Sequence, residues 1–187
     1  MSRKSDQRAQ ATKALASHIL ENGLAQTSLR QLAAAAGVSD RMLLYYFEDK
    51  TEALTAALGA IAAEMTAALA TVIPEGEKLS AGELFEKLSA LTMSAKFKPY
   101  MRISMEMIAA SNDESAPYGA ISNSIATGFL HWIAGNLVSD AGSDTNGDAA
   151  AILALLDGLI VLSICAGDDT ALLARNRLVE TAFRAKN

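Results

Sequence analysis

Residues 27–50, TSLRQLAAAAGVSDRMLLYYFEDK, constrain the fold of this chain more than any other stretch. Thr27 and Ser28 are well placed to cap a helix, because a hydroxyl oxygen can accept a hydrogen bond from the open N–H groups of a first turn. The run that follows is rich in alanine and leucine, which favour helix, and Gly37 is the residue type that ends a helix in the left-handed conformation. Ser39 can cap a second short helix. The segment therefore predicts two helices joined by a glycine turn.

Six apolar residues of this segment would form a small core between the helices: Leu29, Leu32, Ala33, Val38, Leu43 and Phe47. Two helices joined by a short turn that contains glycine form a helix-turn-helix, whose second helix enters the major groove of DNA. Arg41 and Met42 fall in the first turns of that helix, where side chains reach base edges. An arginine can bind guanine O6 and N7 with two hydrogen bonds. A solvated Arg41 near Asp40 or Glu48 is the alternative.

Apolar residues recur at every third or fourth position along most of the remaining chain, which predicts an all-α fold. Only three prolines are present, and 5% aromatic content favours an aliphatic, alanine-rich core. Ser80 and Glu83 have the spacing of a capping box, which marks the start of a helix. The expected helices, about nine in total, are 6–22, the two helices of the motif, 50–71, one that starts at Ser80, 100–110, 118–137, 148–166 and 169–185.

The charge of the chain is unevenly distributed. The formal net charge is −5, but residues 1–50 carry +2 and the remainder carries −7. This asymmetry favours a DNA-reading end attached to an acidic body. Cys165, the single cysteine, lies in an apolar run and is expected to be buried in a reducing cytosol. The polar N-terminus predicts no signal peptide, and Asp157 interrupts the one candidate membrane segment, 149–166, so we expect a cytoplasmic protein without membrane contact.

The string LAAAAGVSDRMLLYYFEDKTEAL resembles the N-terminal domain of TetR-family transcriptional regulators, over roughly residues 8–58. The residues in register are Leu32, Ala33, Gly37, Val38, Ser39, Leu43, Tyr45, Tyr46, Phe47, Lys50 and Leu54. The family often has tyrosine at Leu44, histidine at Tyr46 and a small residue at Arg41, so an unusual operator is expected. The resemblance implies a helix-turn-helix DNA-binding domain, residues 1–51, followed by a larger helical ligand-binding and dimerisation domain, residues 52–187.

The resemblance also implies a function: a dimeric, sequence-specific DNA-binding regulator, by family default a repressor, that a small-molecule effector releases from its near-palindromic operator. The segments 148–166 and 169–185 are too apolar for a single chain, which independently predicts a homodimer, and 148–166 is expected to be buried on two sides. In the family these two helices pair with their mates as a four-helix interface.

The predicted DNA contacts come partly from position in the motif and partly from the resemblance. Lys50 resembles the family lysine that holds a phosphate. Arg30 lies at a position that some members use to contact a base, and a surface salt bridge is the alternative for it. Tyr45 and Tyr46 are adjacent and diverge on a helix, so both cannot be core. The resemblance places both towards phosphates or base edges, and the alternative is that one of them packs against the first helix. The predicted contacts are Thr27, Ser28, Arg30, Ser39, Arg41, Met42, Tyr45, Tyr46 and Lys50.

Methionine and aromatic residues in the second domain could line an apolar effector cavity, or they could be plain core. The predicted ligand contacts are Phe97, Met101, Met105, Glu106, Phe129 and Trp132. Arg102 and Glu106 are spaced to form a helix-surface pair instead. No HExxH, GxSxG, CxxC or glycine-rich phosphate loop is present, so we expect no catalytic residue, metal or cofactor. The competing interpretation is a helical small-molecule-binding enzyme, or a scaffold dimer, whose helix-turn-helix is only structural.

Overall fold

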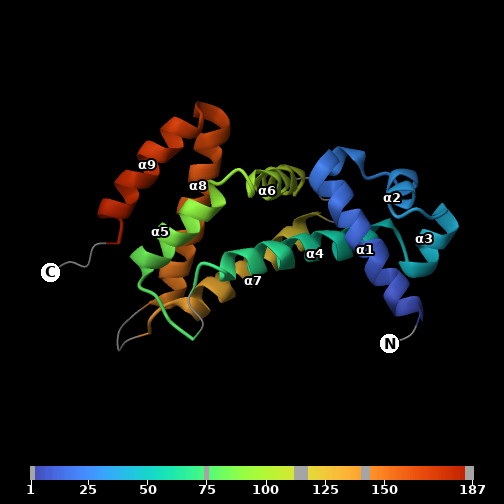
Figure 1. Ribbon diagram of the computed structural model, residues 1–187, viewed down its shortest axis with the longest axis horizontal. Coiled ribbons are helices and arrows are strands. Elements are labelled where there is room, and N and C mark those ends of the chain that lie inside the picture. The colour runs from blue at the N-terminus through green and yellow to red at the C-terminus, as the bar shows by residue number, and fades with distance from the viewer. Residues whose placement is uncertain (1–2, 74–75, 112–117, 140–143, 184–187) are drawn as a thin grey trace. The chain divides into compact units, whose positions relative to one another are not determined.

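In a computed structural model of the chain, residues 3–73, 76–111, 118–139 and 144–183 are described, and helices dominate them. The elements, labelled in Figure 1, are α1 (Arg3–Asn22), η1 (Leu24–Gln26), α2 (Leu29–Ala35), α3 (Asp40–Tyr46), α4 (Lys50–Ala70), α5 (Ala81–Thr92), α6 (Lys98–Ala110), α7 (Tyr118–Asn136), α8 (Thr145–Ala166) and α9 (Asp168–Thr181). The described residues also contain one isolated β-bridge, between Leu79 and Leu137. The prediction of an all-α fold is confirmed.

The chain divides into two compact units. One comprises Met1–Met65 with Pro99–Ile125, and the other comprises Thr66–Lys98 with Ala126–Asn187. Helices α4 and α7 each contribute residues to both units. These units do not coincide with the domains expected from the sequence, which meet after residue 51. The expected domains are defined by function, and that division stays a prediction.

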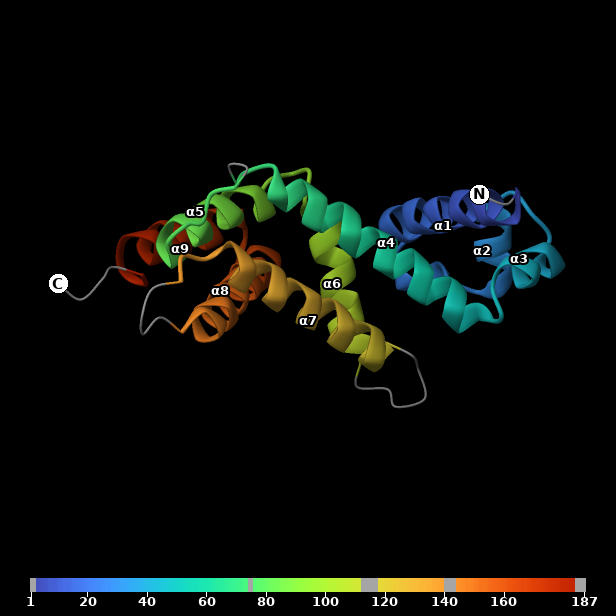
Figure 2. The same cartoon turned by 90° about the horizontal axis from the view of Figure 1, so that it is seen from below.

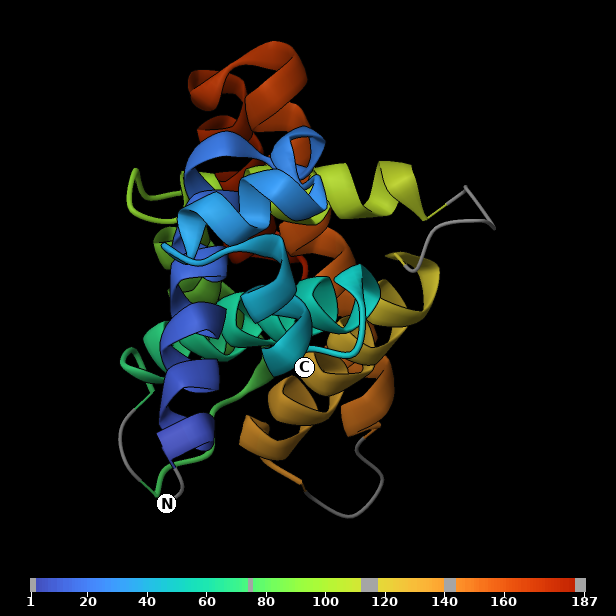
Figure 3. The ribbon, with the colours of Figure 1, turned by 90° about the vertical axis from the view of Figure 1, so that its right-hand side faces the viewer.

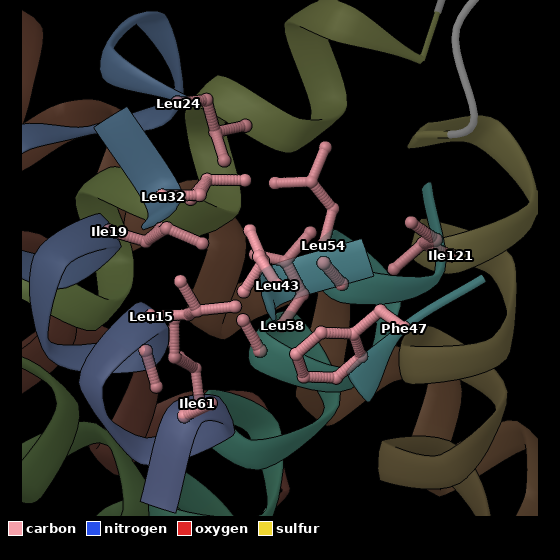
Figure 4. Close-up of a cluster of buried hydrophobic side chains, with 14 of the residues drawn as sticks. Leu15, Ile19, Leu24, Leu32, Leu43, Phe47, Leu54, Leu58, Ile61 and Ile121 are labelled. Carbon is pink, nitrogen blue, oxygen red and sulfur yellow. The ribbon is translucent and has the colours of Figure 1, made fainter. Parts of the chain in front are cut away.

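The first unit is built around one apolar core, shown in Figure 4. Helices α1, α2 and α3 pack on one another, and Figure 3 views them with α2 and α3 toward the reader. Side chains from α4, α6 and α7 complete the same core. Its largest fully buried members are Leu15, Ile19, Leu32, Leu43, Phe47, Leu54, Leu58 and Ile103. The small core predicted within residues 27–50 is thus confirmed, with Leu29 and Val38 at its edge.

In the second unit, α5, α8 and α9 lie side by side (Figure 2). The capping box opens α5: Ser80 Oγ accepts from the Glu83 N–H, and the Glu83 carboxylate accepts from the Ser80 N–H. The Ser80 hydroxyl also donates to the Glu83 carboxylate, at 2.6 Å, and this bond, followed by the one from the Ser80 N–H, lowers the pKa of Glu83 because both favour its charged form. Arg175 on α9 joins α5 by donating to the Ser89 hydroxyl and the Glu86 carbonyl, both at 2.9 Å. Helices α5 and α9 are therefore held together by hydrogen bonds as well as by apolar packing.

One face of α8 has no cover within the described chain, so its burial on two sides, which was expected together with a homodimer, stays a prediction. Val161 and Ile164 are exposed, the latter by 62%, and Cys165 is exposed instead of buried. The other face packs on α5 and α9 through residues such as Ile152 and Leu156. The prediction of a buried Cys165 is wrong for the single chain, because α8 has neighbours on one side only.

Two described helices are long and apolar enough, by length and composition alone, to cross a membrane: Lys50–Ala70 and Thr145–Ala166. The sequence-based expectation had named only the second segment. Helix α4 places Leu54, Leu58 and Ile61 in the core of the first unit. Its apolar character therefore has a structural cause within a folded protein.

Candidate nucleic-acid interface

The turn between α2 and α3 is determined by local hydrogen bonds. Ser28 caps α2, with its hydroxyl accepting from the Gln31 N–H while the Gln31 side chain accepts from the Ser28 N–H. At the other end of α2, the Gly37 N–H donates to Ala34 and the Val38 N–H donates to Ala33, each at 3.0 Å. These two bonds form a Schellman motif, and they require the left-handed conformation that Gly37 adopts, with φ +67°.

Helix α3 begins directly after this turn. Ser39 caps it by accepting from the Met42 N–H at 3.3 Å. Leu43 and Tyr46 point into the core, and Phe47, which follows the helix, is buried in the same core. These residues fix the rotation of α3 about its axis, so its opposite face is left to solvent.

The solvent-facing side of α3 carries Arg41, Met42, Leu44 and Tyr45. Tyr45 is 56% exposed, whereas Tyr46 is 8% exposed. One of the two tyrosines, Tyr46, therefore packs in the core, and the other, Tyr45, does not. The two rings meet edge to face, with centroids 5.8 Å apart.

The residues predicted to contact DNA differ in the solvent exposure of their side chains. Ser28, Arg30, Ser39, Arg41, Met42, Tyr45 and Lys50 are exposed. Thr27 is buried, and its hydroxyl donates to the Leu24 carbonyl at 2.6 Å. Thr27 and Tyr46 therefore offer the least side-chain surface of the nine. DNA contact by all nine residues stays a prediction.

Two basic residues of α1 lie close to α3 and were not among the predicted contacts. The Lys4 ammonium lies over the Tyr45 ring, 4.3 Å from its centroid. The Arg8 guanidinium forms a 2.5 Å ion pair with Glu52 and lies over the Phe47 ring. The only sequence signal for either residue was the excess of basic residues in the first fifty positions.

The six predicted ligand contacts are divided between the two units. Met101, Met105 and Glu106 belong to the first unit, and Phe97, Phe129 and Trp132 belong to the second. Phe97, Met101 and Phe129 are buried, while the other three are partly buried. Ligand contact by these residues stays a prediction.

Glu106 has protein partners of its own. Its carboxylate accepts from the Leu24 N–H at 2.6 Å and lies 3.8 Å from the Arg102 guanidinium. Arg102 in turn donates to the Leu20 carbonyl at 2.6 Å. The pair thus joins α6 to the end of α1 and the start of η1, beyond the helix-surface pairing expected from its spacing.

The described residues contain no cluster of three or more His, Cys, Asp or Glu side chains that could hold a metal ion. Besides the acidic Asp40, the exposed side chains of α3 are cationic, aromatic and apolar: Arg41, Met42, Leu44 and Tyr45. These groups suit hydrogen bonding and stacking against a polyanion or base edges.

Comparison with known proteins agrees with this arrangement. Residues 12–57 match the family model described as "Bacterial regulatory proteins, tetR family". This segment contains α2, the glycine turn, α3 and the start of α4. No curated protein matches the sequence.

Solved structures share the fold over nearly the whole chain. A TetR-family transcriptional regulator from Cytophaga hutchinsonii has a TM-score of 0.79 at 13% identity, covering 100% of this chain and 99% of that one. A putative TetR-family regulator from a Rhodococcus species has a TM-score of 0.75 at 22% identity, covering 95% and 97%. The regulator FadR from Bacillus subtilis, solved with stearoyl-CoA, has a TM-score of 0.64 at 18% identity, covering 96% and 99%.

The family match is confined to the N-terminal segment, whereas the likeness of fold extends to α9. Both agree with the resemblance carried by residues 27–50. The helix-turn-helix segment, residues 12–57, thus matches the tetR family of bacterial regulatory proteins, and the chain as a whole has the fold of TetR-family transcriptional regulators.

Proposed function

We propose that this protein is a dimeric, sequence-specific transcriptional repressor whose affinity for DNA is set by a small-molecule effector. The single observation that carries the DNA-binding part is the exposed face of α3, whose rotation is fixed by Leu43, Tyr46 and Phe47 in the core. A reading helix must hold its side chains in one orientation, because each base contact depends on short, directional hydrogen bonds. The proposal contains no catalytic step.

The exposed residues of the motif divide into two roles. Arg41 and Met42, in the first turn of α3, are proposed to meet base edges. Lys50 and Arg30 are proposed to bind phosphates or a neighbouring base, together with the hydroxyls of Ser28 and Ser39. Phosphate contacts set register without reading sequence. Arg41→Ala should therefore relax specificity, whereas Lys50→Ala should weaken binding to all sequences alike.

The dimer is supported by the uncovered surface of α8 and α9. Val161 and Ile164 on α8 and Leu172 and Leu173 on α9 are exposed, with Leu173 exposed by 72%. Exposed apolar side chains clustered on neighbouring helices mark an interaction site in a soluble protein. A second copy presents the same surface, so a two-fold contact covers both copies at once. The dimer also has two DNA-binding domains, one for each half of a near-palindromic operator.

The effector is proposed by analogy with relatives. The FadR structure was solved with stearoyl-CoA, which shows that one protein of this fold binds a small molecule. We propose that an effector of this chain contacts Phe97, Met101, Met105, Glu106, Phe129 and Trp132. A regulator of this kind acts in the cytoplasm, on the nucleoid.

Selection of bound duplexes from a random DNA pool tests the proposal. The expected result is one enriched near-palindrome, and recovery of unrelated sequences at moderate salt would refute sequence-specific binding.

The dimer is tested separately by sedimentation equilibrium of Ile164→Glu, with Ile108→Glu as the matched control. Both side chains are more than half exposed, at 62% and 52%, but they lie on α8 and α6 respectively. The α8 variant should sediment as a monomer and the α6 variant as a dimer. Two dimeric variants would place the interface elsewhere.

A further inference from the structure

Lys4 lies outside the helix-turn-helix, yet its side chain lies against α3. It is exposed on the first turns of α1, and its ammonium group lies 4.3 Å from the centroid of the Tyr45 ring. Tyr45 also meets Tyr46 edge to face. The exposed ring is therefore flanked by a cation on one side and by a core residue on the other.

The charge of Lys4 is not balanced within the part of the chain that the structure describes. Its neighbour along α1, Arg8, is paired with Glu52 at 2.5 Å, but no carboxylate lies within ion-pair distance of Lys4. A cation above an exposed aromatic ring gains only about 0.5–1 kcal/mol, and that contact leaves its hydrogen-bond donors free. Lys4 can thus bind an anion without giving up its contact with Tyr45.

We propose that Lys4 is a further DNA-contacting residue, whose ammonium group binds a phosphate of the duplex beside the point where Tyr45 meets it. The Tyr45 ring holds the lysine at the edge of the surface formed by Arg41 and Met42. The N-terminal turn of α1 thereby becomes part of the reading surface. This inference rests on the proposed function, and it names a partner group, a backbone phosphate, for a residue outside the helix-turn-helix.

The salt dependence of binding tests the inference, because each phosphate contact contributes about −0.9 to the slope of log K against log salt concentration. Binding to the selected duplex is measured by fluorescence anisotropy between about 50 and 300 mM salt. For each DNA-binding domain of the dimer, Lys4→Ala should make the slope shallower by about 0.9 and weaken binding about eightfold at ~0.1 M salt.

Lys13→Ala is the matched control. Lys13 is an exposed lysine on the same helix, and nine residues place it about half a turn from Lys4 around the helix axis. Its slope and affinity should equal those of the wild type. In a Tyr45→Leu background, the effect of Lys4→Ala should become smaller, since the ring that positions the lysine is gone.

Equal slopes for the wild type and Lys4→Ala would overturn the inference, as would an equal loss in Lys13→Ala, which would indicate a general effect of net charge. These outcomes differ from failure of the proposed function. That failure would appear as wild-type protein with no preference among duplexes, and the slopes could still be compared on any duplex.

Discussion

Gly37 gives the sharpest test of how the helix-turn-helix is built. The residue has φ +67°, and a Cβ built on it meets no heavy atom within 4 Å. Gly37→Ala therefore introduces backbone strain without a collision. The left-handed conformation costs an L-residue about 1–2 kcal/mol, and the smaller freedom of alanine in the unfolded chain offsets about 0.4–1 kcal/mol. The net expectation is destabilisation by about 1 kcal/mol.

Gly59→Ala is the matched control, since a Cβ there also meets no heavy atom within 4 Å. Gly59 lies inside α4, where alanine is favoured over glycine by about 0.8–1.0 kcal/mol. The same substitution should therefore stabilise the protein at one position and destabilise it at the other. Urea unfolding followed by circular dichroism measures both changes in the free energy of unfolding. The slope of that free energy against urea concentration should be the same for both variants and the wild type.

A Gly37→Ala variant at least as stable as the wild type would show that the left-handed conformation at this position imposes no strain. A loss above about 3 kcal/mol would show instead that the added Cβ causes a steric clash. Gly37→Asn should cost less than Gly37→Ala, because asparagine tolerates the left-handed conformation better.

Three further predictions concern the core, the α6 link and Asp157. Phe47→Ala should destabilise the protein by about 3–5 kcal/mol in urea unfolding, because the ring is fully buried beneath α3; a loss below about 1 kcal/mol would contradict the core described here. Glu106→Gln should cost about 1–3 kcal/mol by weakening the acceptor of the Leu24 N–H, and unchanged amide hydrogen exchange at Leu24 would count against that bond. Burial raises the pKa of Asp157, so the wild type loses stability as pH rises through that pKa. Asp157→Asn should therefore have a higher melting temperature than the wild type at pH 7, and the difference should vanish below about pH 4. A difference that does not change with pH would show that ionisation of Asp157 is not its cause.

The helix-turn-helix was predictable because its determinants are local. Ser28, Gly37 and Ser39 act through hydrogen bonds within a few residues, and Leu32 and Leu43 follow from helical spacing. The capping box at Ser80 was predictable for the same reason. Where the signal lay within one turn of helix, the expectation and the structure agree.

Features that depend on contacts distant in sequence were not predictable. The link from Glu106 to Leu24 joins positions 82 residues apart, and the Lys4–Tyr45 contact joins α1 to α3. Spacing alone could not decide which of Tyr45 and Tyr46 is buried, because both lie on one short helix. Cys165 was expected to be buried, since apolar surroundings in sequence do not distinguish a core from a face left open to a partner.

We propose that the exposed face of α3 reads DNA sequence. The most direct measurement compares the affinity of the protein for its selected duplex with its affinity for a scrambled duplex of the same length and composition, both near 0.15 M salt. We expect the selected duplex to bind about 10³-fold more tightly or more, and Arg41→Ala to reduce this ratio. A ratio near one would show that α3 does not read sequence, because the binding would then be due to charge alone.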